Sequence, residues 1–184
     1  TYGWLQSNPG YSIFKAALDA TGLKDTLNLN LKSDTRKIRP CTLLVEHDSI
    51  FQRRNIRSFQ DLAAQISPNN TNYASRSNLL YNYVAYHILE GNLFLDDFEG
   101  IATNYNTYSD VPLNVDGLGI DIAINKNREV FDIIVHPNGD TTFISSVGVL
   151  YDASNLITQT GSIHFINQIM RQKSPVKAIR NYEF

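Results

Sequence analysis

The chain has 184 residues, of which 42% are hydrophobic and 18% are charged, and its formal net charge is -2. This length suits one domain with a sizeable core of its own. The small negative charge gives no basic field for nucleic acid, and no apolar run approaches the roughly 20 residues that span a bilayer.

The first half of the chain has the pattern of amphipathic helices. In "SIFKAALDATGL" apolar residues recur at helical spacing, and Gly22 fits the end of that helix. "SFQDLAAQI" predicts another helix, with Ser58 as its N-cap. A further helix should begin near Asn78, with Leu79 among its core-facing residues, and the helical pattern stops near Tyr86.

A buried strand is predicted between the first two helices. Thr42–Val45 consists of β-branched residues and leucines, and the apolar run around Cys41 predicts a buried free thiol. Asp48 follows the strand and is a good N-cap for "SIFQRRN". We therefore expect its carboxylate to accept N–H groups from the turn that it starts, with His164 close by.

From Leu93 onward the chain is rich in strand patterns. "GIDIAIN" alternates cleanly, and "VFDIIVHPNGDTTFISSVGVLY" predicts two strands around Pro137-Asn138-Gly139, because Asn-Gly is a strong hairpin signal. The apolar segment from Gly161 to Ile169 predicts a last strand in the sheet of Thr42–Val45. Helices followed by strands indicate an α+β fold.

Catalytic and phosphate-binding motifs are missing from the sequence. The four histidines, His47, His87, His136 and His164, lie far apart, and none is spaced at i,i+3 or i,i+4 with another histidine or with Cys41. We therefore expect no cofactor, no metal site and no enzymatic activity. The enzyme alternative is a hydrolase that uses His87 or His164 with Asp48, although no nucleophile motif accompanies them.

Tyr86 and His87 stand side by side in the otherwise apolar segment "YNYVAYHILEG". The functional interpretation is a catalytic or metal-binding histidine. The structural interpretation is a buried pair, which we favour because a buried polar group without a hydrogen bond costs about 1–3 kcal/mol. It predicts that both side chains are mostly buried and that the imidazole has a hydrogen-bond partner in the protein.

Three segments, in the right order, resemble the fasciclin domain family. "TLLVEHDSIF" resembles its first block, matching at Asp48 and Phe51 and departing at Glu46 and His47. "AYHILEG" resembles the Tyr-His block at Tyr86, His87 and Gly91, and "GSIHFIN" resembles the second block, with His164 in place and Asn167 where the family has Asp. The region from Arg128 to Thr160 is longer than the family usually has.

The resemblance implies an α+β, fasciclin-like fold, in which a β-sandwich or wedge core has helices packed on one side. It implies a lead-in at 1–10, the domain at 11–170 and a linker or tail at 171–184. In that setting Tyr86 and His87 would form a buried corner between a helix and the sheet. In animal members the Tyr-His region has also been linked to integrin adhesion, so an adhesive role of this pair is the other expectation.

The function implied by the resemblance is that of a noncatalytic extracellular adhesion or recognition module, cut from a longer secreted or surface protein. Its partner would be a protein or a surface glycan. The opening "PGYSIFKAALDATGL" is similar to fasciclin-domain lipoproteins of gut-type bacteria, some of which accompany outer-membrane glycan uptake systems, so a lipid anchor upstream is expected. The alternative is a glycan-binding accessory protein, with Tyr105 and Tyr108 in "NYNTYSD" as the candidate glycan contacts.

Overall fold

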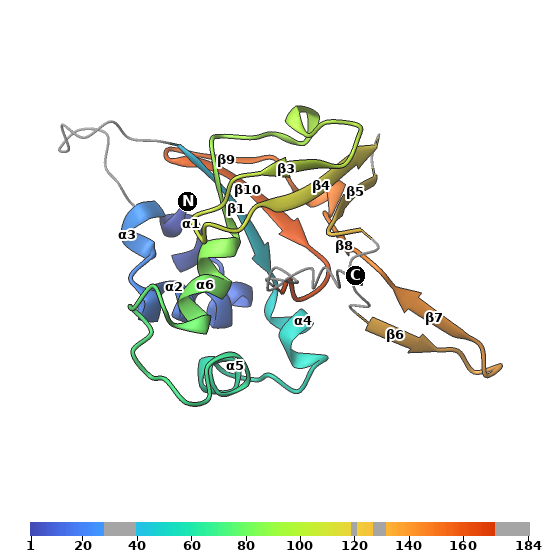
Figure 1. Cartoon of the computed structure of the whole chain (residues 1–184), viewed down its shortest axis with the longest axis horizontal. Helices are drawn as coiled ribbons and strands as arrows, with labels where there is room; N and C mark the ends of the chain where they lie inside the picture. The colour runs from blue at the N-terminus through green and yellow to red at the C-terminus, as the bar shows by residue number, and fades with distance from the viewer. Residues whose placement is uncertain (28–39, 119–120, 127–131, 172–184) are drawn as a thin grey trace, which may run out of the picture.

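The computed structural model of the protein describes residues 1–27, 40–118, 121–126 and 132–171. The helices gather on one side and the strands on the other, so the fold is α+β, as the order of the sequence patterns predicted (Figure 1). The helices are α1 (Tyr2–Gln6), α2 (Ser12–Thr21), α3 (Lys24–Leu27), α4 (Asp48–Gln52), α5 (Phe59–Ile66) and α6 (Leu79–Tyr86). The strands are β1 (Cys41–Glu46), β2 (Ile88–Glu90), β3 (Thr103–Tyr105), β4 (Leu113–Leu118), β5 (Asp121–Ile124), β6 (Asp132–Val135), β7 (Thr141–Ile144), β8 (Val147–Gly148), β9 (Leu156–Thr158) and β10 (Gly161–Ile166).

Within the described residues the strands form two four-stranded sheets and one hairpin. The first sheet has the order β2-β1-β10-β9, the second has the order β3-β4-β5-β8, and β6 pairs with β7. Strands β1 and β10 are parallel neighbours, with Leu44 opposite His164. The prediction that the segment after Gly161 joins the sheet of Thr42–Val45 is therefore confirmed, although the strand ends at Ile166.

Strands β1 and β10 are buried along their whole length, which fits their runs of apolar residues, although the polar Glu46 and His164 are buried as well. Leu43 and Ile163 face a core cluster that they share with the helices, including Phe14 of α2. Leu44 and Ile166 face a second cluster, which lies against residues of the other sheet. The shared strands thus separate the helical layer from the second sheet.

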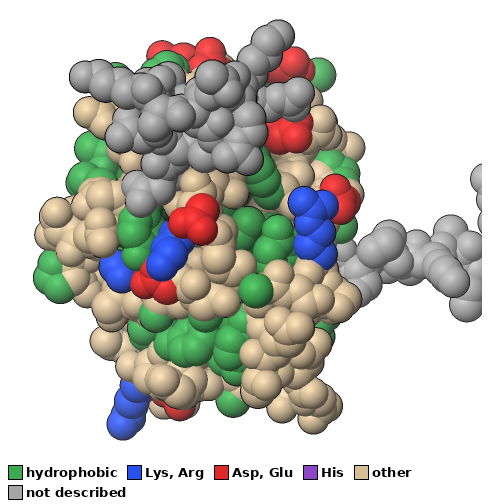
Figure 2. All heavy atoms as spheres, turned by 90° about the vertical axis from the view of Figure 1, so that its left-hand side faces the viewer, with side chains coloured by type: hydrophobic (Ala, Val, Ile, Leu, Met, Phe, Trp, Pro, Cys, Tyr) green, Lys and Arg blue, Asp and Glu red, His purple; other side chains and the backbone are tan. Residues whose placement is uncertain are grey.

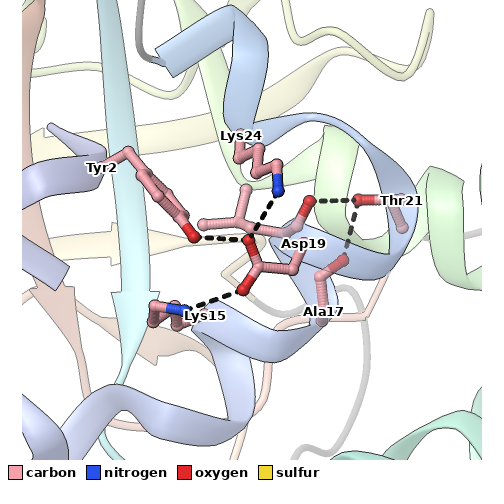
Figure 3. A network of polar contacts seen from close by, with 7 residues as sticks. Tyr2, Lys15, Ala17, Asp19, Thr21 and Lys24 are labelled. Atoms are coloured by element: carbon pink, nitrogen blue, oxygen red, sulfur yellow. Dashed lines mark hydrogen bonds and ion pairs between the residues drawn. The ribbon is translucent and has the colours of Figure 1, made fainter. Parts of the chain in front are cut away.

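Helix α2 is joined to α1 by a polar network (Figure 3). Asp19 accepts a hydrogen bond from the Tyr2 hydroxyl, and its carboxylate lies 2.8 Å from Nζ of Lys15 and 3.4 Å from Nζ of Lys24. Tyr2 and Leu5 of α1 are buried in the same cluster as the buried side chains of α2. The expected lead-in at 1–10 thus contributes to the core, and the domain limits themselves stay predictions.

The predicted helix ends are largely confirmed. Helix α2 ends at Gly22, whose φ of 73° is the left-handed conformation that glycine adopts readily. Ser58 caps α5 by accepting a hydrogen bond from the Asp61 N–H, and Asn78 caps α6 through the Leu80 N–H. The expectation that Leu79 faces the core is wrong, since it is 61% exposed. It is the first residue of α6 and lines an open groove beside α5.

The hairpin β6–β7 projects from the body of the molecule (Figure 1). Its turn is the predicted Pro-Asn-Gly sequence, in which the Gly139 N–H donates to the His136 carbonyl at 2.9 Å and Gly139 has a φ of 87°. Val135 and Phe143 of this hairpin are 70% and 60% exposed. The two strands predicted around Pro137-Asn138-Gly139 are thus confirmed.

Candidate functional site

His87 lies at the corner where α6 ends and β2 begins, and its side chain is fully buried. Its Nδ1 atom is 2.7 Å from the carbonyl oxygen of Tyr83, one helical turn earlier. Its Nε2 atom is 2.7 Å from Oε1 of Glu46. The imidazole also packs against the rings of Phe14 and Tyr83, with centroids 5.1 Å and 4.6 Å away. Both ring nitrogens are therefore engaged inside the protein.

Glu46 is a buried acid, and several hydrogen bonds of this corner converge on its carboxylate. Its Oε1 atom accepts hydrogen bonds from the Tyr83 hydroxyl at 2.9 Å and from the Met170 N–H at 3.2 Å. Burial raises the pKa of Tyr83 well above its usual value, and the neighbouring Glu46 adds to this shift. The Oε2 atom of Glu46 has no hydrogen-bond partner among the described residues. Glu46 thus joins the end of β1 to α6 and to the segment after β10.

Sequence reasoning did not select Glu46, which was noted only as a departure from the family pattern. The available signal was a carboxylate at the end of the apolar run "CTLLVE", where a buried acid requires a partner. Tyr83 has the helical spacing of a core-facing residue, but that spacing does not indicate where its hydroxyl lies.

Tyr86 points away from this cluster, although it precedes His87 directly. Its side chain is buried among the residues between the two sheets, together with Leu44 and Leu113. Its hydroxyl is 3.1 Å from Nδ2 and 3.4 Å from Oδ1 of Asn125. The predicted burial of both residues and the predicted hydrogen-bond partner of the imidazole are confirmed. The two side chains are buried on opposite sides of the corner.

Asp48 caps a helix, but not the one that was predicted. Its carboxylate accepts hydrogen bonds from the Ser12 N–H at 3.1 Å, the Ser12 hydroxyl at 2.6 Å and the Ile13 N–H at 3.0 Å. These groups open α2, whereas the N-cap of α4 is His47, whose Nδ1 accepts from the Ser49 N–H. The prediction that Asp48 accepts from its own turn is wrong, because the fold brings the unpaired N–H groups of α2 to it. Phe51, one turn further on, is fully buried.

His164 is fully buried in β10, and it has its own partners rather than Asp48. Its Nε2 atom donates to the Leu93 carbonyl at 2.8 Å, and its Nδ1 atom accepts from the Asn155 N–H at 3.2 Å. Burial lowers the pKa of His164, and the hydrogen bond to Leu93 opposes part of that shift. These bonds fix one neutral tautomer, since Nδ1 faces a donor and Nε2 faces an acceptor.

The residues of the hydrolase alternative are thus engaged in separate networks. Asp48 binds the start of α2, His87 binds Glu46, and His164 binds Leu93 and Asn155. Within the described ranges, no group of three or more His, Cys, Asp or Glu side chains could hold a metal ion. The buried Cys41 thiol has its pKa raised to about 11 by burial, as expected of a structural cysteine.

The candidate glycan contacts, Tyr105 and Tyr108, are half-buried and pack against different clusters. The Tyr105 hydroxyl accepts from the Glu99 N–H at 2.9 Å, and its ring stands edge-on to Phe98 with centroids 5.2 Å apart. Tyr108 packs at the margin of the helical cluster. The structure therefore does not bring the two rings together into one platform.

A different aromatic cluster lies near the N-terminus, and sequence reasoning missed it. Trp4 and Tyr11 are half-buried, with ring centroids 5.2 Å apart, and Tyr11 meets the exposed His47 edge-on at 5.1 Å. Both Trp4 and Tyr11 also contact Phe165 of β10. Only the fold joins these residues, because they come from four separate segments.

Comparisons with known proteins agree with this architecture. The family model described as "Fasciclin domain" matches residues 9–172. A solved structure of a FAS1 domain pair from the insect cell adhesion molecule Fasciclin I matches with a TM-score of 0.59 and 15% identity. That match covers 94% of this chain and 50% of the other, so the chain spans half the length of the domain pair. No curated protein matches the chain by sequence.

Proposed function

The chain belongs to the fasciclin domain family, a family of adhesion-type modules, and we propose that it serves as a noncatalytic recognition domain on the surface of a cell or in the extracellular space. The observation that supports this proposal is that the motif residues are hydrogen-bonded inside the fold. Asp48, His87 and His164 are all engaged in hydrogen bonds that join distant segments of the fold. They support the scaffold, and recognition is left to its outer surface.

The proposed partner is a protein or a surface glycan rather than a nucleic acid. The net charge is -2, and on the face in Figure 2 Lys and Arg side chains lie among Asp and Glu side chains instead of forming one basic field. In the described part of the chain, no helix is long and apolar enough to cross a bilayer. We assign attachment to a lipid anchor or to further domains of a longer protein.

Localisation is tested by shaving intact cells that express the full-length protein with a protease. We expect loss of the domain while a cytoplasmic marker survives, and release of the protein into the detergent phase when membranes are extracted. Protection of the domain in intact cells that is lost on lysis would contradict the surface location.

Adhesion is tested by coating surfaces with the folded domain and with the heat-unfolded domain, and counting retained cells. We expect retention on the folded coat only. A coat of His87→Ala, used at a temperature where this variant is still folded, should retain as many cells as the native coat. A loss of retention at unchanged stability would instead assign the Tyr-His corner to the binding surface.

The alternative function, a glycan-binding accessory protein of an outer-membrane uptake system, is favoured by the partly exposed aromatic cluster of Trp4, Tyr11 and His47. Aromatic rings that present a face to solvent are suited to stacking on sugars. A glycan array separates the two functions. The glycan function requires saturable glycan binding that Tyr11→Ala weakens. Tyr105→Ala and Tyr108→Ala test the glycan contacts expected from the sequence. An array without any binding signal would exclude the glycan function.

A further inference from the structure

The segment 150–155 connects β8 to β9 and bonds to the end of β10 (Figure 1). Its middle is a single helical turn, Tyr151–Ala153, and the side chains of Leu150 and Tyr151 are 44% and 43% exposed. None of its side chains belongs to either of the two core clusters. Because a segment with few buried apolar contacts opens more readily than the core, hydrogen bonds are what hold it in place.

Among the described residues, three hydrogen bonds attach this segment to β10. The Leu150 N–H donates to the Phe165 carbonyl at 2.7 Å, and the Phe165 N–H donates to the Ser154 hydroxyl at 3.1 Å. The Asn155 N–H donates to Nδ1 of His164 at 3.2 Å. The third bond differs from the other two, because its acceptor is a group that can take up a proton.

Asn155 is the residue through which the segment contacts the buried ring. Its Oδ1 atom also accepts a hydrogen bond from the Leu95 N–H at 2.8 Å. Its φ of 62° is uncommon for a residue with a side chain, although asparagine tolerates it better than most. Asn155 is itself exposed, whereas His164 is fully buried. A movement of Asn155 would therefore open Nδ1 of His164 to water.

The imidazole of His164 can keep its bond to Asn155 only while it is neutral. Its Nε2 atom lies 2.8 Å from the Leu93 carbonyl oxygen, which only accepts, so Nε2 carries the hydrogen. A second proton must bind at Nδ1, where it would face the Asn155 N–H. The bond to Leu93 survives and becomes stronger, because a charged group is the better donor. Protonation thus breaks the contact with Asn155 and keeps the contact with Leu93.

No charged side chain is bonded to the His164 imidazole in the part of the chain that the structure describes. The ring of Phe98 stands edge-on to it, with centroids 5.8 Å apart. On the neighbouring strand β1, Cys41 faces the helical cluster and Glu46 is bonded to His87. The titratable side chains of the segments 93–98 and 150–155 are all exposed, namely Asp96, Asp97, Tyr151 and Asp152. The buried titratable group that bonds to the segment is therefore His164.

We propose that the segment 150–155 is an acid-operated latch, in which a proton from solvent at Nδ1 of His164 displaces Asn155 and releases the segment from β10, while the pairing of β1 with β10 stays closed. Burial lowers the pKa of His164 in the closed form, whereas the open form gives the ring access to water. The open form thus binds the proton more readily. The latch is fully closed above about pH 6.5, and its opening equilibrium rises about tenfold for each pH unit as the pH falls toward the closed-form pKa.

The test is a pH titration of the full chain between pH 7.5 and 5, followed by nuclear magnetic resonance. The ring signals of His164 report its protonation, and amide exchange, corrected for its intrinsic dependence on pH, reports opening. We expect the Leu150 and Asn155 amides to lose protection about tenfold per pH unit below pH 6.5, in step with the ring. The β1 amides that pair with β10 should keep their protection.

Three variants assign the opening to this contact. His164→Gln removes the titrating ring, so the exchange of the Leu150 amide should no longer depend on pH beyond the intrinsic effect. His136→Gln is the matched control, because it replaces an exposed imidazole on the β6–β7 hairpin, and it should open as the native chain does. Ser154→Ala keeps the ring and removes one bond to β10, so its latch should open at a higher pH.

Other outcomes overturn the proposal. If the β1 amides lose protection at the same pH as Asn155, acid unfolds the whole domain and the segment is no latch. If the His164 ring titrates while the Asn155 amide stays protected, protonation does not release the segment. Opening of His164→Gln with the native pH dependence assigns it to another group. An opening pH that Ser154→Ala leaves unchanged refutes the role of the bonds to β10.

Discussion

The Nε2 atom of His87 lies 2.7 Å from Oε1 of Glu46, and both side chains are completely shielded from solvent. Because Nδ1 of His87 faces the carbonyl oxygen of Tyr83, which only accepts, Nδ1 carries a hydrogen. The short contact between Nε2 and Oε1 then needs a hydrogen between the two atoms, because two bare acceptors would repel each other. A pair of this kind holds α6 against β1, because either residue alone would be a buried polar group without its partner.

We expect His87→Ala to lower the free energy of unfolding by about 3–5 kcal/mol, since breaking a buried pair leaves the other group uncompensated. Chemical denaturation at pH 7.5 measures this loss. His136→Ala is the control, because this exposed imidazole has a side-chain bond only to Thr142 among the described residues, and we expect a change within about 0.5 kcal/mol.

The double variant Glu46→Leu/His87→Leu distinguishes the stabilising effect of the Glu46–His87 contact from that of side-chain packing. Replacement of a buried ion pair by apolar residues is often neutral, so the double variant should be more stable than Glu46→Leu alone. If the two single losses simply add, Glu46 and His87 are not coupled and the corner is held by packing instead.

The pH dependence of stability should report on His164. Burial lowers the pKa of this imidazole below the ordinary 6.5 of the unfolded chain, so the unfolded state takes up the proton more readily. Its stabilising effect is therefore complete above about pH 6.5 and is lost as the pH falls toward the folded-state pKa, by up to about 1.4 kcal/mol per pH unit. Protonation of Nδ1 would also set two donors against each other, since Nδ1 accepts from the Asn155 N–H.

The variant His164→Gln removes the titrating group while an amide can still donate and accept. Unfolding curves between pH 7.5 and 5 should show a shallower loss of stability than in the native chain. His136→Gln should keep the native slope, and a slope that His164→Gln leaves unchanged would assign the acid sensitivity to other groups.

Asp48→Ala should destabilise the protein by about 0.5–2 kcal/mol, the usual effect of a lost helix cap. The loss belongs to α2, because the carboxylate binds the Ser12 and Ile13 N–H groups. Hydrogen exchange checks this location. We expect the Ile13 amide to exchange faster in Asp48→Ala, whereas faster exchange confined to α4 would contradict the cap across the fold. Ser12→Ala, which removes only the hydroxyl bond, should cost less.

Gly161→Ala should be among the most damaging single substitutions, with a loss of more than about 2 kcal/mol. A β-carbon at this position would lie 1.7 Å from the carbonyl oxygen of Cys41, and its φ of 146° is unfavourable for residues with a side chain. The parallel pairing of β1 and β10 begins at these two residues. Gly100→Ala is the control, since the space around Gly100 is open, and a thermal melt that ranks the two variants equally would disprove the close approach.

The sequence by itself determined the local elements of this protein. Periodic apolar residues placed α2, α5 and α6, and Ser58 caps its own helix as predicted, because a cap depends on contacts within one turn. The predicted helix start near Asn78 is also confirmed, with Asn78 as its N-cap. The run Thr42–Val45 indicated a strand covered on both faces. The order of blocks indicated the fasciclin family, and the apolar character of the runs after Gly161 and at Thr42–Val45 indicated that both belong to one sheet.

Only the tertiary structure decided where the polar side chains find their partners. Asp48 looked like the cap of its own helix and binds α2 instead, because the fold brings the first N–H groups of that distant helix to its carboxylate. Tyr86 and His87 are neighbours in sequence, but the helix end directs them into different cores. Glu46 is the partner of His87 because β1 passes beside α6. The residue pattern of each segment does not show that the two segments lie next to each other in space.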